Sequence, residues 1–146
     1  MPRYLRLSAF FMILATTVAS SETVYIEGKA AKFRSGPGTN YKVLWEAPVF
    51  TPLEFLAKFK DWYAVRDKDG DVGWVHNQVI AKGKAAVVTD KKADVRKGPG
   101  KDKPMAFAVE KGYLFRVVDE KKEWAKVKDA EGDEGWILKE SLWMSR

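Results

Sequence analysis

The feature that most constrains this chain is a stretch of fifteen residues that returns 62 positions later, at 61–75 and at 123–137. In each copy, two short runs of alternating character flank a turn rich in Asp and Gly, a pattern that predicts a β-hairpin. A hairpin alone is only marginally stable in water, so each copy needs further strands around it. The repeat therefore predicts two similar all-β units.

The similarity extends over 24–81 and 86–143, where 14 positions are identical without a gap. Seven of them are turn residues or tryptophans, each matched 62 positions on: Gly36, Pro37, Gly38, Trp62, Gly70, Gly73 and Trp74. The two repeats therefore share their turn residues and large aromatic side chains, whereas their surface residues differ. Five or six short strands in about sixty residues are typical of a small barrel or sandwich. We expect one domain at 24–82 and another at 86–143, joined by a very short linker.

Composition narrows the possible classes. Hydrophobic residues make up 46% of the chain and charged residues 32%, as in globular proteins. The net charge of +6 comes with interspersed acids, which favours a solvated surface of mixed charge. The chain has no cysteine, which excludes disulfides, Cys-ligated zinc, a Cys nucleophile and a lipid-modified N-terminal Cys.

The first twenty residues form a separate segment. Arg3 and Arg6 precede an apolar run from Leu7 to Val18, and small residues follow. This pattern predicts a secretory signal peptide at 1–20. The run of about twelve residues is short for a transmembrane helix, although an uncleaved anchor is the alternative. We expect an exported protein of the bacterial envelope, periplasmic or extracellular, with no integral membrane segment after cleavage.

Several segments resemble one known family. The chain is similar to the bacterial SH3 family (SH3b) at Phe33–Gly38, Asp61–Val65 and Gly73–Val75. It is closest to the exported branch of that family, which has the pattern R-x-G-P-G…W…V…D-G…G-W-V. Val95–Gly100 repeats the first part of the pattern. The resemblance covers nearly all of the chain after 1–20. It implies two tandem SH3-like β-barrels with a binding or targeting role, often at the cell wall.

The alternation of side chains in the hairpins points to candidate binding residues. Successive side chains of a strand point to opposite faces. The β-branched Val65 and Val127 mark the core face, so Trp62 and Trp124 lie on the other face, among charged residues. The alternative is that each Trp covers the barrel edge or the other repeat, because aromatic residues also dominate ordinary packing.

The family resemblance extends this set. Asp61–Val65 is similar to the D-W-W-x-V segment of peptide-binding SH3 domains, in which the first Trp lines the ligand groove. The resemblance implies that the groove includes Trp62, Trp124, His76, Val79 and Leu138, with Tyr41 as a possible wall. Trp45 and Phe107 are either further walls or core. The chain lacks the aromatic A-L-Y-D-Y segment of those domains and an acidic loop at 36–41, so a proline-rich ligand is not expected.

The motifs that would indicate an enzyme or a cofactor are absent from the sequence. His76 is the only histidine, which cannot make an ordinary zinc site, and no G-x-S-x-G context surrounds a serine. The Gly-Pro-Gly segments lack the spacing of a phosphate loop. Asp67–Asp71 resembles a calcium loop in its alternating acids but lacks the closing Glu, so a hairpin turn is preferred. We expect no catalysis, no cofactor and no metal.

Two functions remain open. The first is a non-enzymatic binding module for cell-wall peptidoglycan or its peptides, with avidity if one ligand reaches both grooves. The second is a protein–protein adaptor or accessory subunit of an envelope complex. Nucleic acid is not expected as a partner, because acids are interspersed with the lysines and the chain is predicted to be exported. If only one groove binds, we expect it to be the first. The oligomeric state is left open.

Overall fold

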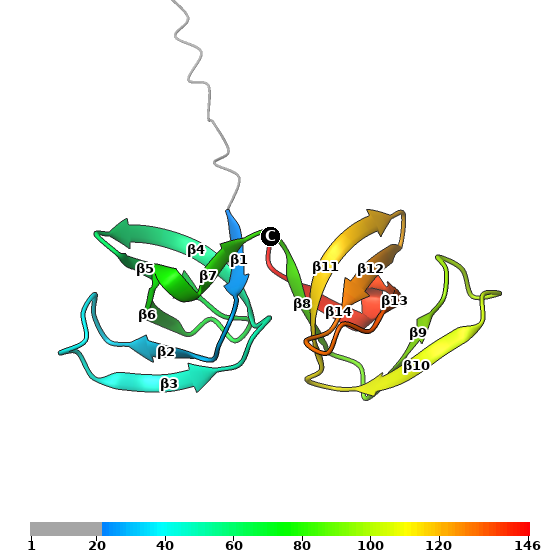
Figure 1. Ribbon diagram of the computed structural model, residues 1–146, viewed down its shortest axis with the longest axis horizontal. Helices are drawn as coiled ribbons and strands as arrows, with labels where there is room; N and C mark the ends of the chain where they lie inside the picture. Colours follow the sequence, from blue (N-terminus) through cyan, green and yellow to red (C-terminus); the bar gives the residue numbers. More distant parts are fainter. Residues whose placement is uncertain (1–21) are drawn as a thin grey trace, which may run out of the picture.

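The computed structural model describes residues 22–146 as two β-barrels side by side (Figure 1). The predicted signal peptide at 1–20 lies outside the described residues. Within 22–146 the regular elements are strands and two short 3-10 helices, without an α-helix. None of the described helices has the length and apolarity needed to cross a membrane. The all-β prediction is confirmed.

The first barrel is an antiparallel sheet of seven strands. In chain order it contains β1 (Thr23–Ile26), β2 (Ala31–Arg34), β3 (Val43–Ala47), β4 (Pro52–Phe59), β5 (Trp62–Arg66), β6 (Val72–His76), the 3-10 helix η1 (Asn77–Val79) and β7 (Ile80–Lys82). The strand order is β3-β2-β6-β5-β4-β1-β7.

The second barrel repeats this arrangement. It contains β8 (Ala85–Val88), β9 (Lys92–Arg96), β10 (Met105–Glu110), β11 (Leu114–Lys121), β12 (Trp124–Lys128), β13 (Glu134–Leu138), the 3-10 helix η2 (Lys139–Ser141) and β14 (Leu142–Met144). The order is β10-β9-β13-β12-β11-β8-β14. The expectation of five or six strands per repeat was too low, because a three-residue strand follows each 3-10 turn and pairs with the first strand of its own barrel.

The repeated hairpins are β5–β6 and β12–β13. In the first, the Asp67 amide donates to the Asp71 carbonyl at 3.0 Å, and the Asp67 carboxylate accepts from the Asp69 and Asp71 amides. Gly70 takes a φ of 88°, a value that suits glycine. The segment 67–71 is thus a hairpin turn, as preferred from the sequence.

The long strand β4 pairs with two neighbours and contains a bulge. Its register shifts between Phe55 and Ala57, and its first residues are buried while its last ones are exposed. Residues 52–54 of β4 pair with β1, and residues 54–59 pair with β5. A bulge bends a strand and increases its twist, which is how a sheet of short strands curves into a small barrel.

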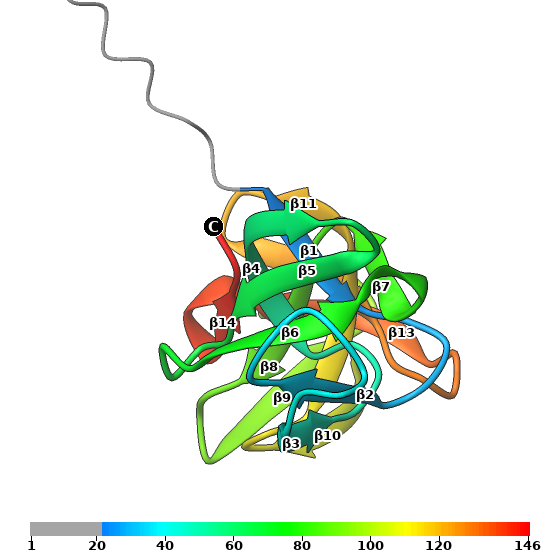
Figure 2. The ribbon, with the colours of Figure 1, turned by 90° about the vertical axis from the view of Figure 1, so that its left-hand side faces the viewer.

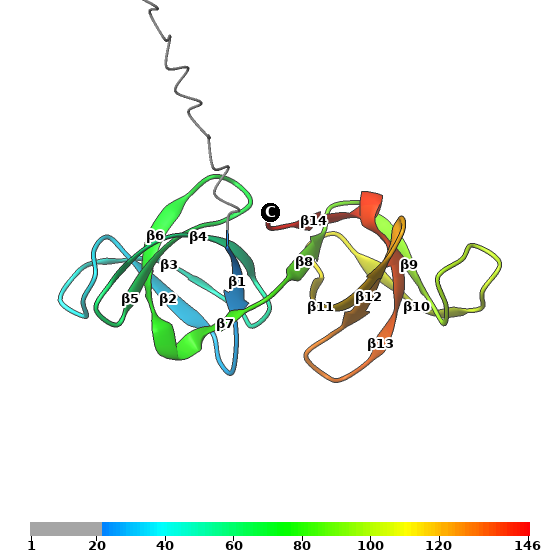
Figure 3. The ribbon, with the colours of Figure 1, turned by 90° about the horizontal axis from the view of Figure 1, so that it is seen from above.

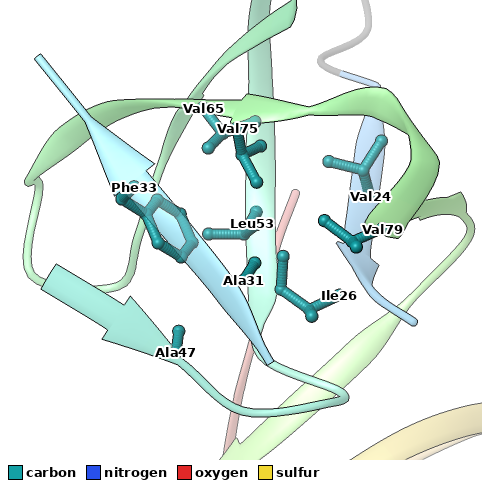
Figure 4. Packing of buried hydrophobic residues seen from close by; sticks show 9 residues of the cluster. All are labelled: Val24, Ile26, Ala31, Phe33, Ala47, Leu53, Val65, Val75 and Val79. Carbon is teal, nitrogen blue, oxygen red and sulfur yellow. The ribbon is translucent and has the colours of Figure 1, made fainter. Parts of the chain in front are cut away.

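The cores consist of the inward-facing residues of these strands. The cluster in the first barrel contains Val24, Ile26, Ala31, Phe33, Ala47, Leu53, Val65, Val75 and Val79 (Figure 4). Val65 and Val127 are fully buried, which confirms the predicted core face. Trp45 stacks on Phe33 at 4.8 Å, and Phe107 packs against the second core, so both belong with the cores.

The linker between the barrels is an extended segment bonded on both sides. The Gly83 amide donates to the Thr23 carbonyl at 3.1 Å, and the Lys84 carbonyl accepts from the Val117 amide at 2.9 Å. The Lys84 ammonium lies 2.8 Å from Glu120, whose carboxylate also contacts Lys139 at 3.1 Å. The hydrogen bond from Lys84 is the largest influence that lowers the pKa of Glu120. These contacts tie the linker to β1 of one barrel and β11 of the other.

Candidate ligand-binding grooves

The centre of the first candidate site is an aromatic pair. Antiparallel pairing sets Trp62 at the start of β5 opposite His76 at the end of β6. The two rings meet edge to face, with centroids 5.2 Å apart and planes at 80°. The imidazole Nδ1 accepts a hydrogen bond from the Gln78 amide at 3.1 Å and so caps η1. The histidine is therefore held in place by the turn that follows it, and it supports one side of the Trp62 ring.

A cavity of about 430 Å³ lies against this pair. It is lined by Lys29, Ala30, Ala31, Lys32, Arg34, Thr39, Trp62, Val75, His76 and Val79. The buried Ala31, Val75 and Val79 provide an apolar floor. Three cations surround that floor, and no carboxylate from residues 22–146 lines it. We call this cavity the first groove.

The alternation of β2 explains why lysine and arginine border an apolar floor. Ala31 and Phe33 are buried, whereas Lys32 is exposed and Arg34 is half-buried. Strand β2 pairs with β6 at Arg34 and Trp74, which brings these cations beside the Trp62–His76 pair. Because β2 and β6 are separated by about forty residues of sequence, only the closure of the barrel assembles the groove.

Arg34 also shapes the loop after β2. Its Nη1 donates to the carbonyls of Thr39 and Tyr41, at 3.1 and 3.0 Å. The arginine of the R-x-G-P-G pattern thus clamps the loop that follows it. The ring of Tyr41 lies against Gly36, where a Cβ atom would collide with it, and beside Gly38. Tyr41 is 44% exposed but does not line the first groove, so the structure does not bring this predicted residue to the site.

The second barrel has a cavity of about 350 Å³ at the corresponding place. It is lined by Asp90, Lys92, Ala93, Asp94, Arg96, Lys101, Trp124, Leu138, Glu140 and Ser141. Trp124 and Leu138 form the cross-strand pair equivalent to Trp62 and His76. We call this cavity the second groove.

The two grooves differ in charge and in the exposure of their tryptophan. The second groove has three cations and three carboxylates, against three cations and none in the first. Trp124 is only 5% exposed, whereas Trp62 is half-buried, so the packing alternative describes Trp124 better than Trp62. Leu138 provides no side-chain cap to its 3-10 turn, unlike His76.

The structure therefore brings together most of the predicted set. Trp62, His76 and Val79 line the first groove, and Trp124 and Leu138 line the second. Sequence reasoning missed the cations at Lys29, Lys32 and Arg34. The alternation of side chains over 31–34 could have indicated Lys32 and Arg34, because it places them on the face opposite Phe33.

A third polar arrangement lies in the turn of the second hairpin. The Asp129 carboxylate is 4% exposed and accepts three hydrogen bonds: from the Glu131 and Asp133 amides at 3.0 and 2.9 Å, and from the Tyr113 hydroxyl at 2.8 Å. The bond to Asp129 is the main cause that raises the pKa of Tyr113 to about 12. Asp129, Glu131 and Asp133 lie close enough to face one cation, but the bonds to Asp129 already account for its burial. Its role is to build the turn.

Comparison with known proteins agrees with this architecture. Two family models, each described as a bacterial SH3 domain, match residues 29–81 and residues 89–144. The chain is also 24% identical over 141 residues to a protein of Bacillus subtilis (strain 168) named "Putative N-acetylmuramoyl-L-alanine amidase YrvJ". The match covers 84% of this chain and 27% of that protein, so the chain spans about a quarter of its relative's length.

Among solved structures, NlpC2 from Trichomonas vaginalis is 12% identical, with a TM-score of 0.38 over 85% of this chain and 48% of its own. An NlpC/P60 family protein from Bacillus cereus ATCC 10987 is 14% identical, with a TM-score of 0.41 over 85% of this chain and 56% of its own. At these scores the likeness is too weak to support an inference. The two family matches and the two barrels show that the chain belongs to the bacterial SH3 family, with two such domains in tandem.

Proposed function

We propose that this protein is an exported, non-enzymatic binding module of the bacterial envelope, and that its first groove binds the peptides of peptidoglycan. The observation that carries the proposal is the composition of the first groove. The Trp62 ring, which contacts His76, lies beside an apolar floor, and three cations but no carboxylate of the described chain surround that floor. Such a groove suits a small ligand that is anionic and has short apolar side chains.

The peptides of peptidoglycan have this chemistry, since they combine alanine methyl groups with free carboxylates. A carboxylate bound by lysine or arginine makes charge-assisted hydrogen bonds, which are stronger than neutral ones. Within residues 22–146 Arg34 donates through Nη1 alone, to the loop carbonyls, so its Nη2 and Nε can donate to a ligand. Membership of the bacterial SH3 family and similarity to a protein named for an amidase of muramoyl-alanine bonds support the same ligand class.

Sedimentation with purified sacculi tests the proposal. The mature chain is expected to pellet with sacculi, and a smaller fraction of Trp62→Ala is expected to pellet. Tyr41→Ala is the matched control, because Tyr41 is an exposed aromatic residue outside the groove. If the wild-type chain stays in the supernatant at low salt, peptidoglycan is not the ligand. If Trp62→Ala pellets as well as the wild type, the groove is assigned wrongly.

Salt separates recognition by a groove from simple charge attraction. At an ionic strength of about 0.15 M, exposed charges more than about 8 Å apart are largely screened. Binding through the first groove is expected to weaken with salt but to persist, because its apolar floor and tryptophan are not screened. Complete loss at 0.15 M would show that only the surface lysines attract the sacculus.

One observation favours an adaptor as the second candidate function. Strand β3 is the edge of the first sheet, and the exposed side chains Tyr41, Val43 and Leu44 lie at its start. An exposed apolar edge strand can pair with a strand of another protein. This function predicts no retention on sacculi and co-purification with one defined envelope protein, reduced by Leu44→Lys.

A further inference from the structure

The two grooves lie on opposite sides of the molecule. Seen from above in Figure 3, β6 and β13 run in opposite directions, so η1 (green) lies at the lower side of the view and η2 (red) at the upper side. Figure 2 agrees, with η1 on the right and η2 on the left. The first groove uses His76 and Val79 from β6 and η1, and the second uses Leu138 and Ser141 from β13 and η2. A ligand bound in one groove therefore faces away from the other.

The contacts of the linker hold this arrangement. Only Gly83 and Lys84 separate β7 from β8, and both are hydrogen-bonded to strands, one to each barrel. Glu120 adds ion pairs to Lys84 and to Lys139 in the turn of the second groove. A linker of two bonded residues cannot swing one barrel far enough to bring both grooves to the same side. A short ligand thus cannot occupy both grooves of one molecule, and the condition for avidity on one ligand is not met.

We propose that the protein bridges two separate strands of its ligand, one in each groove. This inference rests on the proposed function, because it takes both grooves to bind the same polymer. The charge difference between the grooves adds a detail. The first groove, lined within residues 22–146 by three cations and no carboxylate, takes an anionic segment, whereas the second, with three cations and three carboxylates, takes a segment of balanced charge.

A two-step capture assay tests the bridge. Sacculus fragments are fixed to beads, the mature chain is added, and unbound protein is washed away. Fluorescent sacculus fragments are then offered to the loaded beads. The wild-type chain is expected to stay on the beads and to capture the second fragments. Light scattering confirms beforehand that the protein is monomeric under the assay conditions, so that one molecule makes the bridge.

Two single-groove variants are the matched pair. Lys32→Glu changes an exposed residue of the first groove, and Lys92→Glu changes an exposed residue of the second, so both are expected to fold normally. Each variant is expected to remain partly bound to the beads but to lose the capture of fluorescent fragments. A flexible insertion between Gly83 and Lys84 is expected to lower capture and to raise retention, because both grooves could then reach one fragment.

The outcomes separate the bridge from the proposed function. If the wild-type chain does not bind the beads, the proposed function and the bridge both fail. If the wild-type chain binds but captures no second fragment, the bridge alone fails. Capture by both single-groove variants at the wild-type level would also overturn the bridge, since one groove would then suffice.

Discussion

Removal of the Tyr113 hydroxyl isolates one hydrogen bond of the second barrel. In Tyr113→Phe the ring keeps its packing on Phe115, at a centroid distance of 5.0 Å, but Asp129 loses the donor at 2.8 Å. The carboxylate remains buried, with the two amides of its turn as partners. The substitution therefore measures how much the hydrogen bond from Tyr113 to Asp129 contributes to the stability of the second barrel.

The expected loss of stability follows from the type of hydrogen bond and from its exposure to solvent. A hydrogen bond to a charged group contributes about 1.5–3 kcal/mol to stability. Because Tyr113 retains some contact with solvent, we expect the lower end, about 1.5 kcal/mol. For a domain of this size, such a loss corresponds to a fall in melting temperature of about 6–12 °C.

The pH dependence provides a second signature. The pKa of Tyr113 is raised to about 12, so the folded state holds the hydroxyl proton more tightly than the unfolded state. The stabilisation is therefore complete below the unfolded pKa of about 10 and is lost as pH rises toward 12. The difference in stability between the wild type and Tyr113→Phe is expected to be constant below about pH 9 and to shrink above it.

Urea unfolding followed by circular dichroism, repeated from pH 7 to 11.5, measures both signatures. Tyr63→Phe is the control, because Tyr63 is a half-buried tyrosine packed edge-on against Phe55, without a hydroxyl bond within 22–146. It is expected to change stability by less than about 0.5 kcal/mol. Equal effects of the two substitutions, or a Tyr113→Phe difference that does not vary with pH, would refute the reasoning.

Three further predictions concern stability. Glu120→Gln removes a carboxylate that contacts two lysines and has a lowered pKa, so we expect a loss of stability of about 0.5 kcal/mol at pH 7. This loss is expected to fade below about pH 4, where the wild-type carboxylate becomes protonated. Urea unfolding at pH 7 and pH 3 measures it, and an equal loss at pH 3 would contradict the prediction. Gly70→Ala forces a Cβ into a φ of 88° in open space, so thermal unfolding is expected to show a loss of about 1–2 kcal/mol from strain alone. Leu53→Ala empties a fully buried core site and is expected to cost about 2–5 kcal/mol, while Leu56→Ala on the exposed part of the same strand stays within about 0.5 kcal/mol.

The candidate site could be predicted in part because hairpin register is a local property. The position of Trp62 relative to Val65 follows from the alternation of one strand, and its pairing with His76 follows from the turn between them. Tyr41 lies outside the first groove because its ring position depends on the Gly36–Gly38 loop and the clamp from Arg34. That loop geometry is not periodic, so no pattern in the sequence reports it.

The sequence by itself determined the repeat, the strands and the face of each strand that enters the core, because side-chain alternation and turn chemistry act over a few residues. Only the tertiary structure decided the charge around the first groove. Closure of the barrel brings Lys32 and Arg34 of β2 beside His76 of β6, across about forty residues of sequence. It also decided that the two grooves face opposite ways. That orientation results from how two bonded linker residues, Gly83 and Lys84, carry one strand from the first sheet into the second.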